Sequence, residues 1–291
     1  MVKDMKNPIG VHALVWVGGT TDDEIDLAIA RTRAAGYDCL ELSLHDLAHL
    51  DVERTRGALD EADLGVVCSR GLAFDADVSS DDPAVCARGA DLLAESLRVS
   101  HSLGAKLFTG ALYGALGKYS APVTATGRSN AVAAIRDVAA EAERYGMGLG
   151  IEVCNRYETN VVNTARQALE LTGDIGADNV KVHLDTYHMN IEEDDLIRPV
   201  LEVGDRLGYV HVGENHRGYL GSGHIDFTSF FHALADIDYQ GGITFESFSS
   251  EVVAQGLSND LAIWRNLWSD GAELAGHALG FITSGMLAAD R

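Results

Sequence analysis

Hydrophobic and polar positions along the chain follow two periods that alternate with each other. Runs with apolar residues at helical spacing end at or near a glycine, and a short aliphatic run follows within a few residues. RTRAAG before YDCLELSL (31–44) and AERYG before MGLGIEVC (142–154) are examples. A glycine at this point fits the left-handed end of a helix. The pattern therefore predicts helices that each lead into a buried strand.

The same junction recurs throughout the chain, at residues 31–44, 62–72, 100–113, 142–154, 172–185, 205–215 and 238–248. With PIGVHALVW (8–16) as the first strand, the number of predicted strands reaches eight. Alternating strands and helices without Pro-rich linkers imply right-handed crossovers and a parallel sheet. Eight such units in 291 residues predict an α/β fold, a single (β/α)8 TIM barrel over 1–291 with 257–291 as closing C-terminal helices.

Local signals at the helix ends agree with this fold. TDDE (21–24) and SDDP (80–83) are typical helix N-terminal sequences. No GxGxxG motif lies between the first strand and the first helix, so an open dinucleotide-binding sheet has no support. Trp264 and Trp268 are four residues apart, which predicts one helical face that packs in the core or at a subunit interface.

Composition excludes several classes of partner. The net charge of −22 and the pI near 4.7 would repel a phosphate backbone, so we expect no nucleic acid partner. No apolar stretch is long enough to span a bilayer, and the N-terminal residues lack the apolar core of a secretory signal. The four cysteines form no CxxC pair and are interpreted as free thiols. We therefore expect a cytoplasmic protein with no membrane partner.

Candidate chemistry lies at the ends of four consecutive predicted strands. The active site of a barrel forms at the C-terminal ends of its strands, and the fifth to eighth strands bring Glu152, Asp185, His211 and Glu246 there. On each strand the aliphatic residues take the opposite parity, so all four side chains are predicted to point inward. Three carboxylates and one imidazole buried together require a compensating cation. Oxygen-rich ligation favours Mn²⁺, Mg²⁺ or Co²⁺ over a structural zinc ion. The alternative is a hydrogen-bonded polar plug without metal.

Four segments carry a specific resemblance: IEVCNRYE (151–158), LDTYHMNIEE (184–193), HVGENHRG (211–218) and TFESF (244–248). They closely resemble the ketose 3-epimerases of the D-tagatose, D-allulose (D-psicose) and L-ribulose group, and the whole chain aligns with that family. The resemblance implies a metal-dependent isomerase that epimerises C3 of free ketoses through an enediolate. It assigns Glu152 and Glu246 as the catalytic acid/base pair and as metal ligands, whereas Asp185 and His211 only hold the ion. One divalent metal per subunit is expected, with Mn²⁺ as the first choice.

Further residues are expected to bind the sugar. By resemblance, Arg217 and His188 contact the O2 region, and Glu158 holds Glu152 or a substrate hydroxyl. Trp16 and Phe248 are candidates for an apolar wall. The complete predicted substrate-binding set is Glu158, His188, Arg217, His12, Trp16 and Phe248. The resemblance also implies a homo-oligomer, a tetramer or a dimer.

Departures from the family leave the preferred ketose open. Many relatives carry an aromatic residue at the position of His12 and proline at the position of Ser247, and the loop GALGKYSAPV (114–123) is distinctive. L-ribulose/L-xylulose, D-fructose/D-allulose and D-tagatose/D-sorbose all remain candidates. Two other functions stay open: an aldose–ketose isomerase of the same superfamily, and a non-catalytic sugar-binding barrel. A DNA-repair enzyme of this barrel type would need more histidine ligands and a basic surface.

Overall fold

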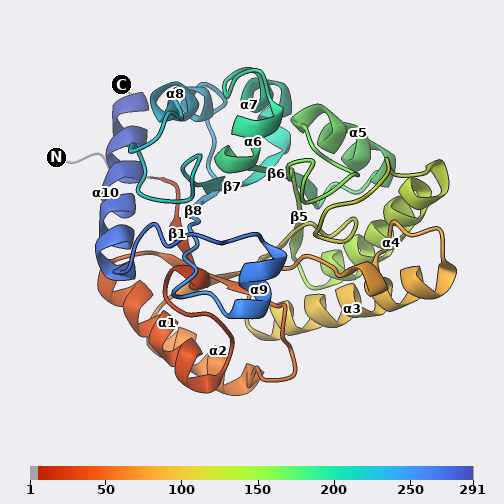
Figure 1. The fold of residues 1–291 in the computed structure, drawn as a ribbon, viewed down its shortest axis with the longest axis horizontal. Coiled ribbons are helices and arrows are strands. Elements are labelled where there is room, and N and C mark those ends of the chain that lie inside the picture. Colours follow the sequence, from red (N-terminus) through yellow and green to blue (C-terminus); the bar gives the residue numbers. More distant parts are fainter. Residues whose placement is uncertain (1–5, 291) are drawn as a thin grey trace.

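The computed structural model describes residues 6–290, and its centre is a closed barrel of eight parallel strands in sequence order (Figure 1). Strand β8 pairs with β1 and closes the barrel, with Val11 opposite Phe245. The predicted (β/α)8 fold is confirmed. The strands are β1 Ile9–His12, β2 Cys39–Ser43, β3 Gly65–Ser69, β4 Leu107–Gly110, β5 Gly148–Glu152, β6 Val180–Asp185, β7 Leu207–Val212 and β8 Gly242–Phe245.

Helices surround the strands as an outer ring (Figure 1). The helix α10 packs against α8 and α1, and the Tyr37 hydroxyl donates a hydrogen bond to the Ala275 carbonyl at 2.8 Å. No helix in the described part of the chain has the length and apolar character that crossing a bilayer requires. The helices are α1 Asp22–Ala35, α2 Val52–Glu61, α3 Pro83–Ser102, α4 Ala125–Arg144, α5 Ala165–Ile175, α6 Thr186–Glu192, α7 Arg198–Val203, α8 Phe227–Asp236, α9 Gln255–Asp260 and α10 Gly271–Ala289.

The predicted glycine ends of helices are found at some junctions only. Gly36 and Gly176 end α1 and α5 with φ of +88° and +70°, as expected for left-handed caps. Gly65 and Gly208 instead lie within β3 and β7. After α2 the left-handed position belongs to Asp63, with φ +51°. Aspartate accepts this conformation because its short polar side chain can hydrogen-bond locally.

The first strand and the C-terminal region also differ from the prediction. β1 ends at His12, and residues Ala13–Val15 form a 3₁₀ turn in place of a strand to residue 16. Of the predicted region 257–291, the described residues 257–290 are helical only at the end of α9 and in α10, and the segment between these helices is irregular. Trp264 lies in that segment with 77% of its surface exposed, whereas Trp268 is 5% exposed. The two tryptophans therefore do not share a helical face.

Strand register sets the positions of the polar side chains. Glu152 lies opposite His183 between β5 and β6, and Asp185 lies opposite His211 between β6 and β7. Gly150 sits two residues before Glu152, and a Cβ there would lie 2.3 Å from the Thr109 hydroxyl oxygen. Glycine thus leaves room for a polar group inside the barrel, next to the strand ends that carry the candidate site.

Candidate active site

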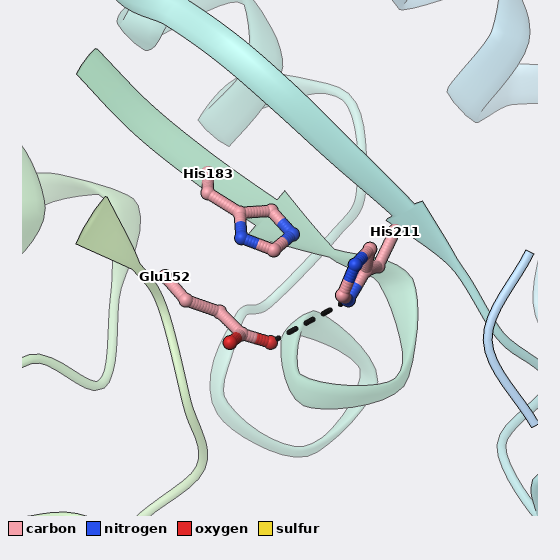
Figure 2. Close-up of side chains that lie close together, drawn as sticks. All are labelled: Glu152, His183 and His211. Atoms are coloured by element: carbon pink, nitrogen blue, oxygen red, sulfur yellow. Dashed lines mark ion pairs between the residues drawn. The ribbon is translucent and has the colours of Figure 1, made fainter. Parts of the chain in front are cut away.

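The structure brings the four predicted ligand side chains together at the C-terminal end of the barrel. Asp185 and His211 are 0% and 1% exposed, and Glu246 is 6% exposed. Ligand atoms of Asp185, His211 and Glu246 all lie within 4.8 Å of one another. The Nδ1 atom of His211 is 3.6 Å from Glu152 Oε1 and 3.5 Å from Glu246 Oε1. Figure 2 shows Glu152 and His211 facing each other.

The Nε2 nitrogen of His211 has a buried partner, Glu41, that was not among the residues predicted for the site. Glu41 of β2 is fully buried, and its Oε2 lies 2.7 Å from His211 Nε2. The Tyr209 hydroxyl donates to the same oxygen at 2.7 Å. Among the described residues, Nδ1 of His211 has no hydrogen-bond partner although it is buried. The imidazole therefore presents one unsatisfied nitrogen to the carboxylate cluster.

The electrostatics of the cluster reflect its burial. Loss of solvation raises the pKa of the Glu152 carboxyl to about 7 and that of Asp185 to about 6. Burial also acts on Glu246, but the charge of Arg217 outweighs it and holds the pKa of Glu246 at about 2. Burial opposes a charge on His211, yet Glu41 and Glu246 raise its pKa well above the usual value. The site as a whole attracts positive charge.

Arg217 places a positive charge next to this carboxylate cluster. Its guanidinium group lies 3.2 Å from Asp185 Oδ2 and donates a hydrogen bond to Glu246. It also stacks over the Tyr187 ring, 3.8 Å from the centroid, and lies 4.9 Å from the centroid of Phe248. Tyr187 was not among the residues predicted for the site, although it lies within the LDTYHMNIEE segment (184–193).

The backbone at Arg217 is unusual and is held by neighbours. Its φ of +61° lies in the left-handed region, which non-glycine residues seldom adopt. The buried Ser247 hydroxyl donates to the Arg217 carbonyl and accepts a hydrogen bond from the Trp268 indole N–H at 2.8 Å. Ser247 thus connects the loop that carries Arg217 to the irregular segment before α10.

His188 and Glu158 are organised by a shared partner. His188 Nδ1 accepts hydrogen bonds from the backbone N–H and the side-chain amide of Asn155, at 3.1 and 2.8 Å. The proton of the neutral ring is therefore on Nε2, which lies 3.7 Å from Glu152 Oε1 and 3.6 Å from Asp185 Oδ2. The same Asn155 amide donates to Glu158 at 2.7 Å. Burial raises the pKa of Glu158 to about 7.

The three remaining predicted residues differ in their positions. His12 is buried, with Nε2 3.7 Å from Glu41 Oε1, and its ring meets the Phe248 ring edge-on at 6.0 Å. Trp16 belongs to the main hydrophobic core, where its indole N–H donates to the Thr32 hydroxyl of α1 at 2.9 Å. Within the described chain, no hydrogen bond or ring contact of Trp16 reaches the carboxylates.

A cavity of about 150 Å³ adjoins the cluster. Its walls come from the loops after β5, β7 and β8, from α6, and from the irregular segment between α9 and α10. The distinctive loop 114–123 does not line this cavity, and its Tyr119 hydroxyl donates a hydrogen bond to Asp77 at 2.6 Å. The lining residues are Glu158, Tyr187, Asn215, His216, Arg217, Phe248, Leu261, Ala262, Ile263, Trp264, Arg265 and Leu267.

Comparisons with known proteins identify the family. The xylose isomerase-like TIM barrel family matches residues 29–282. An L-ribulose 3-epimerase of Methylomonas sp. is 50% identical over 273 residues, which cover 94% of this chain and 96% of that protein. A ketose 3-epimerase of Arthrobacter globiformis is 49% identical, with 94% and 95% covered. This chain belongs to the ketose 3-epimerase family. Members of this family are isomerases, and so is this protein.

A solved structure of a family member supports the same assignment. The D-allulose 3-epimerase from Methylomonas sp. in complex with D-allulose is 48% identical and has a TM-score of 0.94, with 98% of this chain and 99% of that one covered. Both the fold and the length of this chain therefore match those of a ketose 3-epimerase.

The donor set of this family member fits a divalent cation. Nδ1 of His211 is buried without a hydrogen-bond partner among the described residues, and it converges with carboxylate oxygens of Asp185 and Glu246. Histidine nitrogen together with several carboxylate oxygens is the set that Mn²⁺, Mg²⁺ and Co²⁺ accept. Two further groups satisfy the same distance limit, Glu152 with His183 and His211, and Glu152 with Cys154 and His188. Glu152 thus lies at ligand distance from His211 but in a different group from Glu246.

Proposed function

We propose that this protein is a metal-dependent enzyme that inverts C3 of free ketoses, with Glu152 and Glu246 as its acid/base pair. The observation that carries the proposal is the placement of these two carboxylates. Glu152 ends β5 and Glu246 directly follows β8, and the two carboxylates lie 3.6 and 3.5 Å from the same nitrogen of His211. A ketose held at this end of the barrel would lie next to both carboxylates.

Inversion at C3 requires two proton transfers on opposite faces of the carbon. One glutamate removes the proton and leaves a planar enediolate, and the other glutamate delivers a proton to the opposite face. In the reverse direction the two residues exchange roles. A positioned acid–base group contributes about 10²–10⁴ in rate, so the remaining acceleration must come from stabilising the negative charge of the enediolate.

Glu152, Asp185, His211 and Glu246 would hold the ion, for which we propose Mn²⁺, with Mg²⁺ and Co²⁺ as alternatives; when bound, it acts as a Lewis acid toward the ketose oxygens. Arg217 adds a fixed positive charge on the same side, and its stacking on Tyr187 holds the guanidinium plane. His188 offers an Nε2–H donor to substrate oxygens, while Glu158 accepts a hydrogen bond from a sugar hydroxyl. Phe248 forms an apolar wall of the cavity.

The substrates that we propose follow from the relatives and the cavity. L-ribulose and D-allulose come first because relatives that cover nearly the whole chain carry these sugars in their names. D-fructose and L-xylulose are the corresponding C3 epimers, and the D-tagatose/D-sorbose pair is a further candidate. Arg217 lines the cavity of about 150 Å³ and contacts Asp185 and Glu246, so we expect recognition of the sugar near C3 to exceed recognition at its far end.

The test follows the proton at C3. The protein is stripped with a chelator, Mn²⁺ is restored, and L-ribulose or D-fructose is followed by NMR in D₂O. We expect deuterium at C3 together with the C3 epimer, and both should disappear without metal. Deuterium at C1 with formation of an aldose would instead identify an aldose–ketose isomerase. Binding of the ketose without any exchange would identify a non-catalytic sugar-binding barrel.

A variant of Glu246 and a matched control variant test the role of this carboxylate in proton transfer. Glu246→Gln should lose turnover by about 10²-fold or more, whereas Glu251→Gln, an exposed glutamate on the same loop, should retain it. Mn²⁺ binding by each variant is measured in parallel, because loss of a ligand and loss of a base both lower activity. Full turnover by Glu246→Gln with metal bound would remove Glu246 from proton transfer.

We also propose a homo-oligomer, a tetramer or a dimer, located in the cytoplasm. The support is the family membership alone. Light scattering during size-exclusion chromatography measures the mass directly, and a monomeric mass would contradict the proposal.

A further inference from the structure

Glu41 is a buried carboxylate that the proposed chemistry does not use directly. It lies in the middle of β2 between Leu40 and Leu42, with no exposed surface. Its side chain crosses the interior of the barrel to β7, where Oε2 meets His211 Nε2 at 2.7 Å and the Tyr209 hydroxyl at 2.7 Å. A buried charge with only two donors is costly, so its retention at this position calls for a specific role.

The contact fixes which nitrogen of His211 carries the proton. The metal-free cluster raises the pKa of His211, but a histidine that binds a cation must be neutral, and a neutral imidazole has one N–H donor and one lone pair. Because the carboxylate of Glu41 can only accept a hydrogen bond, the donor on His211 must be Nε2. The lone pair is then on Nδ1, the nitrogen that lies 3.6 Å from Glu152 and 3.5 Å from Glu246 and has no partner in the described chain.

We propose that Glu41 is a positioning residue that keeps His211 in its Nε2–H tautomer and aims Nδ1 at the bound cation. The proposal rests on the proposed function in one respect, namely that a divalent ion binds at this cluster. A carboxylate behind a ligating histidine fixes the ring and raises the basicity of the ligating nitrogen. Glu41 therefore acts on the metal without touching it.

Tyr209 provides a matched control for a purely structural role. Its hydroxyl donates to the same Oε2 of Glu41 and lies in the same buried layer of the barrel. Tyr209→Phe removes this hydrogen bond but leaves the Glu41–His211 contact in place. If Glu41 only fills and satisfies the barrel interior, Tyr209→Phe and changes at Glu41 will affect the same properties. If it positions His211, only changes at Glu41 will affect the metal.

The experiment measures Mn²⁺ binding to the metal-stripped full-length protein, with free Mn²⁺ detected by EPR. Glu41→Met keeps the volume and removes the acceptor, and we expect it to raise the Kd for Mn²⁺ by about 10- to 100-fold. Glu41→Gln keeps an acceptor oxygen and should raise Kd less. Tyr209→Phe should leave Kd close to that of the parent protein, even where it lowers thermal stability.

A second measurement keeps the proposal testable if Glu41→Met does not fold. In Mg²⁺-loaded protein with ¹⁵N-labelled histidine, the ring nitrogens of His211 should show a proton on Nε2 in the parent. Glu41→Gln should retain this pattern but with weaker Mn²⁺ binding.

Three outcomes distinguish the possibilities. A folded Glu41 variant with the Kd of the parent would overturn the proposal, and so would a proton found on Nδ1 of His211 in the parent. A parent protein that binds no Mn²⁺ would instead contradict the proposed function.

Discussion

The Ser247 hydroxyl offers a stability prediction whose size can be worked out from its contacts. Ser247 is fully buried, donates to the Arg217 carbonyl, and accepts from the Trp268 indole N–H at 2.8 Å. Ser247→Ala leaves both of these groups without a partner. Each buried group that loses its hydrogen bond costs about 1–3 kcal/mol, so we expect the free energy of unfolding to fall by about 3 kcal/mol.

The measurement is urea denaturation of metal-stripped protein, followed by circular dichroism. Ser250→Ala is the control, because Ser250 is exposed in the same loop. A double-mutant cycle with Trp268→Phe tests the mechanism, since Trp268→Phe already removes the indole N–H. The double variant should cost less than the sum of the two single variants. A Ser247→Ala protein within about 0.5 kcal/mol of the parent would refute the reasoning, because that is the range of ordinary surface substitutions.

Three further predictions concern the metal, the arginine and the barrel interior. Removing the metal should lower the melting temperature measured by differential scanning calorimetry, because a ligand at 100 times its Kd stabilises the folded state by about 2.7 kcal/mol; equal melting temperatures would show that no ion binds. Tyr187→Ala should raise KM for the ketose by up to about 10-fold through loss of cation–π stacking on Arg217, whereas Tyr187→Phe should leave it near the parent value. Gly150→Ala should destabilise the protein by about 1–3 kcal/mol because its Cβ would lie 2.3 Å from the Thr109 hydroxyl oxygen. Adding Thr109→Ala should recover part of that loss in the same urea assay.

The part of the site that could be predicted from the sequence depends on local patterns. Each of the strands β5 to β7 shows an alternation in which aliphatic residues take one parity and the polar ligand takes the other. That parity alone places Glu152, Asp185 and His211 on the inward face near the strand ends. The structure confirms this convergence, with Asp185 opposite His211 in the register.

Contacts between distant residues could not be predicted in this way. Glu41 and His211 are 170 positions apart, and no local pattern connects them. The available signal was an acidic residue between two leucines in a buried strand, which indicates an unusual environment but not its partner. The contact between Ser247 and Trp268 has the same origin, since an irregular segment brings the indole to the serine.

Some predictions from local patterns were wrong because the same residues are compatible with two backbone conformations. The spacing of Trp264 and Trp268 suits a helix, but Ala262 has φ of +53° and the segment leaves the helical path. Gly65 was expected to end α2, yet Asp63 takes the left-handed position and the glycine enters β3. Propensity alone does not decide such cases, because tertiary packing overrides differences of about 1 kcal/mol per residue.

Pairing of β1 with β8, which closes the barrel, must occur before all four candidate ligands can come together during folding. Pairing of Val11 with Phe245 joins the two ends of the chain, and Glu246 follows directly after that pairing. Such long-range pairings are slow because the loop entropy is lost before the contacts form. During synthesis, the earlier ligands emerge from the ribosome while the last is still missing. The complete set of four proposed ligands would therefore form only after the barrel has closed, so a cation that needs all four would bind the folded barrel and not an earlier intermediate.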